Sequence, residues 1–155
     1  MTKHKSLIVG LVALIALLWV YYGAFITNAD HISFAPYGDG YKNYYTLAYY
    51  LKYDSGTHFS GMNYPYGENV IYTDNQPLAA WILKPVTKLF PSLLNNVQLI
   101  IVCLLMLGHL LAYYITYKIL LRLNLPSMFA AMLGVLIIML SPQLVRLNGH
   151  FSLGY

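Results

Sequence analysis

Residues 7–26 read LIVGLVALIALLWVYYGAFI, a run of twenty residues without a charged side chain. At about 1.5 Å per residue, a helix of this length covers roughly 30 Å, the thickness of the hydrocarbon core of a bilayer. Lys3, His4 and Lys5 come just before the run. Because basic residues collect on the cytoplasmic side of a membrane span, the sequence predicts a transmembrane helix with its N-terminus in the cytoplasm.

A cleaved secretory signal peptide is the alternative for this segment, since Thr27 and Ala29 have the small size found at positions −3 and −1 of a cleavage site. The apolar run is longer than the usual signal-peptide core. The aromatic residues Trp19, Tyr21 and Tyr22 also suit the interface at the end of a retained span. These two features favour the transmembrane helix.

Two further apolar runs, at about 97–117 and 127–145, predict a second and a third span. Lys118 and Arg122 lie in the short connection between them, which places residues 118–125 in the cytoplasm. Cys103 lies within the second run, where we expect a small buried side chain. His109 lies there too, and an ionisable residue inside a span normally faces protein, so a packing role is expected.

The composition agrees with an all-α integral membrane protein, because 59% of the residues are hydrophobic and only 9% are charged. A soluble domain of this size carries more surface charge. The formal charge of +4 lies mostly at the ends of the apolar runs, and no basic cluster indicates nucleic-acid binding. We expect a single multi-pass membrane domain over 1–155 with a long outer loop at about 27–96.

The outer loop is where the polar chemistry of the chain collects. Ten of the sixteen tyrosines lie in it, between residues 37 and 72. It also contains all five carboxylates, namely Asp30, Asp39, Asp54, Glu68 and Asp74. A membrane protein that places its acids and hydrogen-bonding aromatic residues in one loop is expected to present a functional site there.

The end of the outer loop, residues 77–90, is apolar but too short to span a bilayer. It carries Trp81, Lys84 and Lys88 and is interrupted by Pro85. Aromatic and lysine side chains suit a helix that lies in the membrane interface, which we predict here. A re-entrant segment is the alternative.

Asp39 lies between Gly38 and Gly40, ahead of a helix-permissive segment at 41–53. Two roles are open for this residue. Aspartate is a preferred N-cap, and its carboxylate then accepts a backbone N–H at the start of the helix. A carboxylate on a flexible turn at a membrane cavity instead suits a general base or a metal ligand.

The segment 61–77 is rich in turn-forming residues and in side chains that both donate and accept hydrogen bonds. Tyr64 and Tyr66 are candidate carbohydrate-binding residues, because tyrosine combines apolar area with a polar tip. Packing at the membrane interface is the alternative role for the rings. Glu68 and Asp74 are candidate second carboxylates, with solvated loop acids as the alternative.

Four phrases carry a resemblance to a known family: Gly-Asp-Gly-x-Lys-Asn-Tyr-Tyr-Thr at 38–46, Gly-Met-Asn-Tyr-Pro-Tyr-Gly-Glu at 61–68, Thr-Asp-Asn-Gln-Pro at 73–77 and Asn-Gly-His-Phe-Ser-Leu at 148–153. In this order along three spans, they resemble the N-terminal part of bacterial membrane glycosyltransferases of the C-type (GT-C) superfamily. The resemblance covers essentially the whole chain, and it implies that the chain is the front portion of a larger protein.

The resemblance implies a sugar donor linked to polyprenyl phosphate in the bacterial inner membrane. In that superfamily an acid of the first outer loop acts on the acceptor or holds a metal, and Asp39 is the matching position. Lys42, Asn43, Arg146 and His150 are candidate substrate contacts, since a departing phosphate needs cationic or hydrogen-bonding partners. This chain has a single acid where the superfamily has a pair, which leaves a divalent metal cofactor open and assigns no metal ligand.

Two functions are therefore consistent with the sequence alone. The first is transfer of a sugar to an acceptor on the outer face of the membrane, with Asp39 as base. The alternative is a non-catalytic membrane subunit, or a component of a polysaccharide-handling transporter, whose tyrosine-rich loop only binds. Asp30 and Asp54 lie outside the shared phrases, so we expect both to tolerate substitution.

Overall fold

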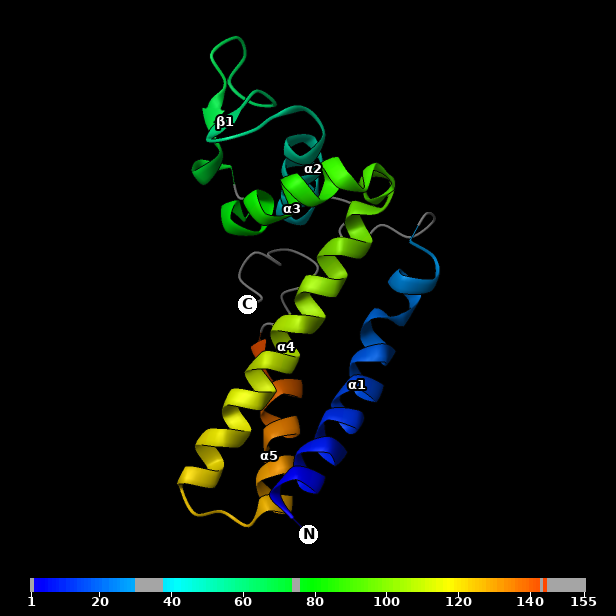
Figure 1. The fold of residues 1–155 in the computed structure, drawn as a ribbon, viewed down its shortest axis with the longest axis vertical. Helices are drawn as coiled ribbons and strands as arrows, with labels where there is room; N and C mark the ends of the chain where they lie inside the picture. Colours follow the sequence, from blue (N-terminus) through cyan, green and yellow to red (C-terminus); the bar gives the residue numbers. More distant parts are fainter. Residues whose placement is uncertain (1, 30–37, 74–75, 143, 145–155) are drawn as a thin grey trace.

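A computed structural model describes residues 2–29, 38–73, 76–142 and 144. The chain is mostly helical, with one short pair of strands. Three helices run side by side, and the remaining elements form a cap at the end of this bundle far from the N-terminus (Figure 1). The elements in order are α1 (Lys3–Thr27), α2 (Gly38–Tyr53), β1 (His58–Phe59), β2 (Glu68–Asn69), η1 (Val70–Tyr72), α3 (Pro77–Leu89), η2 (Pro91–Asn96), α4 (Val97–Arg122) and α5 (Ser127–Met139).

Two helical stretches in the described part of the chain are long and apolar enough to cross a membrane, Lys3–Thr27 and Pro91–Arg122. The first stretch is near the N-terminus, and a signal sequence at that position could have the same length and apolar composition. Only 28% of the most apolar window of each stretch is buried. The core helix of a soluble protein is mostly buried, so this large exposed apolar surface favours a membrane environment.

The third helix of the bundle is shorter than the predicted span at 127–145. Helix α5 has 13 residues and ends at Met139. Ser141 precedes Pro142, and a proline disfavours the helical conformation in the residue before it. At about 1.5 Å per residue, α5 covers roughly 20 Å, which is less than a hydrocarbon core.

The three helices of the bundle pack closely where Gly10 and Gly134 lie against the ring of Tyr113. Tyr113 of α4 is fully buried. A Cβ atom added to Gly10 of α1 would lie 1.8 Å from the Tyr113 hydroxyl oxygen, and one added to Gly134 of α5 would lie 3.1 Å from its ring. The glycines therefore let all three backbones approach this ring.

Two hydrogen bonds fix the N-terminal end of α1 to the other helices. The Ser6 hydroxyl donates to the Ser127 hydroxyl oxygen at 3.0 Å. The Tyr117 hydroxyl donates to the Lys3 carbonyl oxygen at 2.7 Å. The lower part of the bundle is thus joined by polar contacts as well as by packing.

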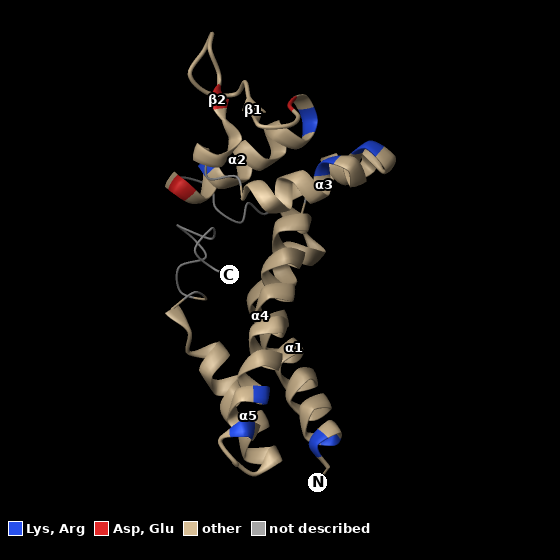
Figure 2. Cartoon of the chain, turned by 60° about the vertical axis from the view of Figure 1, so that its left-hand side comes forward, with Lys and Arg blue, Asp and Glu red and all other residues tan. Residues whose placement is uncertain are grey.

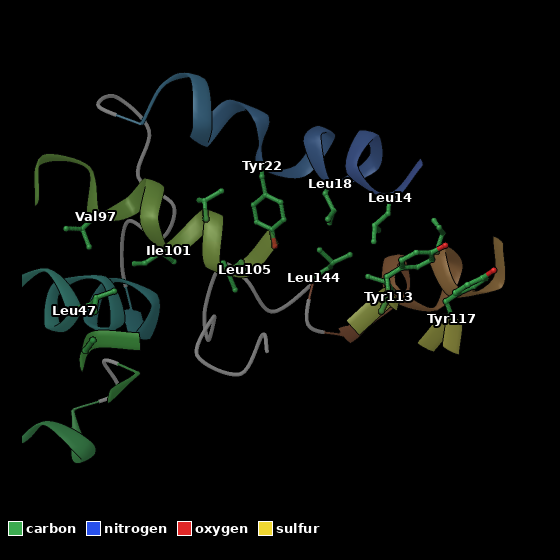
Figure 3. Packing of buried hydrophobic residues seen from close by; sticks show 14 of the residues in the cluster. Leu14, Leu18, Tyr22, Leu47, Val97, Ile101, Leu105, Tyr113, Tyr117 and Leu144 are labelled. Atoms are coloured by element: carbon green, nitrogen blue, oxygen red, sulfur yellow. The ribbon is translucent and has the colours of Figure 1, made fainter. Parts of the chain in front are cut away.

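The core is continuous from the bundle into the cap. Tyr22 of α1 points toward Leu105 of α4, and Leu14 of α1 points toward Tyr113 of the same helix α4 (Figure 3). Further up, Leu47 of α2 lies beside Val97, at the start of α4 (Figure 3). Because one cluster includes both regions, the cap is attached to the bundle by buried side chains and is not a loosely tethered loop.

The cap consists of α2, α3 and a hairpin that the sequence analysis did not predict. In the hairpin, β1 and β2 pair in antiparallel fashion, with His58 opposite Asn69 and Phe59 opposite Glu68. Helix α3 was predicted at 77–90 and occupies Pro77–Leu89, with Pro85 inside it. It lies across the upper end of α4, as expected for an interfacial helix (Figure 1).

A lysine joins the two cap helices. The Lys84 ammonium of α3 donates to the carbonyl oxygens of Tyr50 at 3.1 Å and Leu51 at 2.8 Å, which lie in the last turn of α2. A cation at this end of a helix also interacts favourably with the helix dipole. Burial, followed by the charge of Lys88, lowers the pKa of Lys84 from its ordinary value, while Asp54 acts in the opposite direction.

Candidate functional site

The start of α2 holds the residue predicted to be catalytic. The helix begins at Gly38, whose φ of +70° is a conformation that glycine adopts without strain. Asp39 is exposed and lies within the first turn. The helix thus starts earlier than the predicted Tyr41, and Asp39 is inside it rather than at the predicted N-cap. A carboxylate here is stabilised by the positive end of the helix dipole.

Asn43 lies one turn further along α2, beneath Asp39. It is only 2% exposed, and its side-chain N–H donates to the Asp39 carbonyl oxygen at 2.7 Å. Its side-chain oxygen is buried and has no hydrogen-bond partner within the described residues. Lys42, beside it, is half-buried. Three of the predicted site residues, Asp39, Lys42 and Asn43, therefore lie within the first two turns of α2.

The hairpin presents the two predicted carbohydrate-binding tyrosines. Tyr64 is 94% exposed and Tyr66 is 87% exposed, so neither ring packs on the protein. The loop that carries them extends beyond α2, away from the bundle of α1, α4 and α5 (Figures 1 and 2). For these two rings, packing against the described part of the chain is excluded, whereas a binding role and packing at the membrane interface both stay open.

Glu68 is part of the hairpin's own framework. Its carboxylate accepts from the side-chain N–H of Asn63, and at 3.1 Å from the backbone N–H of Asn69. Asn63 has a φ of +54°, which asparagine tolerates better than most residues. The loop between β1 and β2, residues 60–67, is called the tyrosine loop below. The Glu68 carboxylate thus holds the turn at the base of the tyrosine loop, a structural role that does not require substrate.

Asp54 is the acid that sequence reasoning underestimated. It is 7% exposed and accepts hydrogen bonds from the Ser60 backbone N–H at 2.9 Å and the Ser60 hydroxyl at 2.8 Å. The expectation that Asp54 tolerates substitution does not fit this environment. An aspartate that follows a helix and precedes Ser-Gly is a turn signal that could have identified this role.

Three predicted site residues, Asp74, Arg146 and His150, lie outside the described residues. The part of the chain that the structure describes contains no group of three histidine, cysteine or acidic side chains placed to hold a metal ion. A divalent metal at Asp39 would therefore need ligands from elsewhere.

Inside the bundle, His109 is 4% exposed and faces protein, as predicted. Its Nδ1 lies 2.7 Å from the Leu105 carbonyl oxygen, and its ring meets Tyr22 edge-on at 6.2 Å between centroids. These contacts fit a packing role. Cys103, in contrast, is exposed, and the expectation of a buried thiol was wrong. It lies on a face of α4 that would contact lipid.

These features define a helical protein with two stretches able to span a membrane and a polar cap at one end. The chain belongs to the family described as a domain of unknown function, DUF6311, which matches residues 10–154. No curated protein and no solved structure matches the chain.

Proposed function

We propose that the chain is the N-terminal portion of a bacterial membrane glycosyltransferase that uses a lipid-linked sugar. The observation that carries this proposal is the exposed Asp39 in the first turn of α2, one turn before Asn43, whose buried amide oxygen has no hydrogen-bond partner within the described residues. A carboxylate one helical turn from an amide group suits a bound hydroxyl group, because a hydroxyl both donates and accepts hydrogen bonds.

The proposed reaction transfers a sugar from polyprenyl phosphate to an acceptor hydroxyl. The acceptor oxygen bonds to the anomeric carbon, the bond from that carbon to the phosphate oxygen breaks, and polyprenyl phosphate leaves with the electron pair. Asp39 takes the hydroxyl proton as general base. Lys42, Arg146 and His150 would stabilise the phosphate, and Asn43 would orient the acceptor. Asp74 and the tyrosine loop, held in place by Glu68, would bind the acceptor.

In this proposal α1, α4 and the region from Ser127 onward are three spans of the inner membrane, with the N-terminus in the cytoplasm. The charges support this arrangement, because they lie at the two ends of the molecule and leave the middle of the helices bare (Figure 2). At the N-terminal end the described charges are all basic: Lys3, Lys5, Lys118 and Arg122. This excess agrees with the cytoplasmic side of a membrane.

The decisive change is Asp39→Asn in the full-length protein, because it removes the charge and keeps the shape. A general base needs the charge, so sugar transfer should fall by roughly 100-fold or more. The measurement is transfer from polyprenyl-phosphate glucose, galactose and mannose in membranes containing the protein. Asp30→Asn is the matched control and should retain activity.

Insertion and thermal stability of Asp39→Asn should match the unmodified protein, since the side chain is exposed. Near-normal transfer by Asp39→Asn would remove the catalytic role and leave Asp39 as a helix-end residue. Absence of transfer by the unmodified protein with all three donors, together with retained binding of glycans, would favour the non-catalytic binding subunit.

A further inference from the structure

Helix α3 has a row of large apolar side chains that the described part of the chain leaves exposed. Leu78, Ile82 and Leu89 are 72%, 60% and 76% exposed, and Phe90, just after the helix, is 59% exposed. Spacings of four and seven residues place the three helical side chains on one side of α3. A contiguous exposed surface of this kind marks contact with another protein or with a membrane.

The opposite side of α3 attaches the helix to the cap. Ala80 and Thr87 are buried, and each is two positions, or roughly half a turn, from Leu78 or Leu89 in the apolar row. Lys84 donates from this buried side to the last turn of α2. The apolar row therefore points away from α2 and away from the protein interior.

The place of α3 in the chain puts the apolar row at the end of a membrane span. The long apolar stretch Pro91–Arg122 begins directly after Phe90, and α3 ends at Leu89. Helix α3 lies across the upper end of α4, at the level where this stretch would leave the bilayer (Figure 1). An amphipathic helix in this position lies in the plane of the interface, with its apolar side among the acyl chains.

The apolar row is continuous with the surface of α4 that faces lipid in this arrangement. Leu78 and Ala79 line one side of a groove of about 520 Å³, and the other side includes Leu107 and Leu111 of α4. Leu107 and Leu111 are 61% and 57% exposed. Because the two exposed surfaces meet in this groove, the lipid that covers α4 also reaches α3.

The polar side chains of α3 fit the head-group region. The helix contains Lys84 and Lys88 and no acidic residue, so its charge is complementary to the phosphates of lipid head groups. Trp81 is 43% exposed, and its indole N–H donates to the Gly56 carbonyl oxygen at 2.8 Å. Tryptophan and lysine are side chains that favour the boundary between head groups and acyl chains.

We propose that α3 lies in the outer leaflet of the bilayer, with Leu78, Ile82, Leu89 and Phe90 among the acyl chains, and that this contact supports the cap on the membrane surface. The partner is the lipid surface itself, because the row is open and continuous with the exposed side of α4. The proposal rests on the membrane arrangement of the proposed function and does not depend on sugar transfer.

The test is the accessibility of spin labels in the full-length protein, reconstituted in phosphatidylcholine nanodiscs. Single cysteines carry the label at positions 78, 82 and 89, and all other cysteines, including Cys103, are replaced by serine. Electron paramagnetic resonance compares collision with oxygen, which concentrates in the hydrocarbon region, and collision with a water-soluble nickel chelate. At all three positions the ratio of oxygen to nickel accessibility should be about tenfold higher than at position 66 in the tyrosine loop.

A label at position 107 of α4 reports on the membrane span separately and should show the same high ratio of oxygen to nickel accessibility. A high ratio at 107 with water-like ratios at 78, 82 and 89 would overturn the proposal and leave the span intact. Low accessibility to both reagents at those three positions would also overturn it, because protein would then cover the row. A water-like ratio at 107 would remove the membrane arrangement on which the proposal rests.

Ile82→Asp tests whether the apolar row holds α3 in the leaflet, because a carboxylate is costly among acyl chains. The ratio of oxygen to nickel accessibility at position 78 should fall about fivefold. Lys88→Asp is the matched control, since it adds the same exposed side chain to α3 outside the row, and it should leave the ratio unchanged. If Ile82→Asp unfolds, Leu89→Asp replaces it. An unchanged ratio in a folded variant of the row would overturn the proposal.

Discussion

At the scale of single residues, two aspartates have opposite environments. Asp39 lies in α2, and Asp54 lies in the turn that follows this helix. Asp39 is exposed at the start of the helix, whereas Asp54 is buried just after its end and holds Ser60 by two hydrogen bonds. A buried carboxylate with two donors stabilises the fold, whereas an exposed one can be reached by a substrate. Substitution by asparagine should therefore reduce sugar transfer at position 39 and reduce the free energy of unfolding at position 54.

Asp54→Asn should lower the free energy of unfolding by about 1–3 kcal/mol, because one of the two donors of Ser60 loses its acceptor inside the cap. The measurement is thermal unfolding of the purified protein in detergent. Asp39→Asn is the matched control and should unfold at nearly the unmodified temperature. Equal unfolding temperatures for the two variants would show that the Ser60 contacts contribute little.

At the scale of elements, the approach of α1 to α4 depends on one glycine. Gly10→Ala would place a Cβ atom 1.8 Å from the Tyr113 hydroxyl oxygen, so the two helices must separate or the ring must move. We expect a loss of about 1–3 kcal/mol in the free energy of unfolding, as for other overpacked cores. Thermal unfolding in detergent measures it.

Gly23→Ala is the control for this change, because its Cβ would meet only the Trp19 ring, at 3.0 Å, and that side chain is half-exposed and able to move. Adding Tyr113→Phe to Gly10→Ala removes the nearest atom and should restore part of the stability. A double variant no more stable than Gly10→Ala alone would mean that the hydroxyl is not the source of the clash.

For the hairpin, the prediction concerns binding of the glycan acceptor. Tyr64→Ala and Tyr66→Ala should each raise the apparent KM for the glycan acceptor about fivefold, since a stacked ring contributes roughly 1 kcal/mol. Membrane insertion should be unaffected, because both rings are exposed. Tyr72→Ala is the matched control, because this tyrosine lies outside the loop and is also exposed, at 75%. If all three variants keep the unmodified KM, the loop does not bind the acceptor.

At the scale of the whole molecule, the distribution of charge predicts its orientation in the membrane. After Cys103→Ser, a cysteine at position 55 in the cap should react with a membrane-impermeant thiol reagent in intact cells. A cysteine at position 123, between α4 and α5, should react only in inverted vesicles. Ser55 and Leu123 are both exposed, so access across the membrane is the only expected difference. The reverse labelling pattern would mean that the N-terminus is outside.

The positions of the long helices were predictable because their signal is local. A bilayer requires about twenty consecutive apolar residues in a helix that satisfies its own backbone hydrogen bonds. The runs at 7–26 and 97–117 meet this requirement, and α1 and α4 include both. The same local reasoning found α2 and α3, with boundaries wrong by three residues or fewer. For α5 it predicted a longer segment, 127–145, than the helix that ends at Met139.

The amino-acid sequence by itself determined which segments are helical and that the acids and tyrosines gather between two apolar helices. Only the tertiary structure decided which of those residues are exposed, buried or left without a partner. Asp54 is buried by the turn that follows α2, Lys84 reaches α2 from 33 positions away, and Gln76 meets α4 across a groove. The reason is physical: helix formation in an apolar run depends on neighbouring residues, whereas burial and polar satisfaction depend on residues brought together from distant parts of the chain.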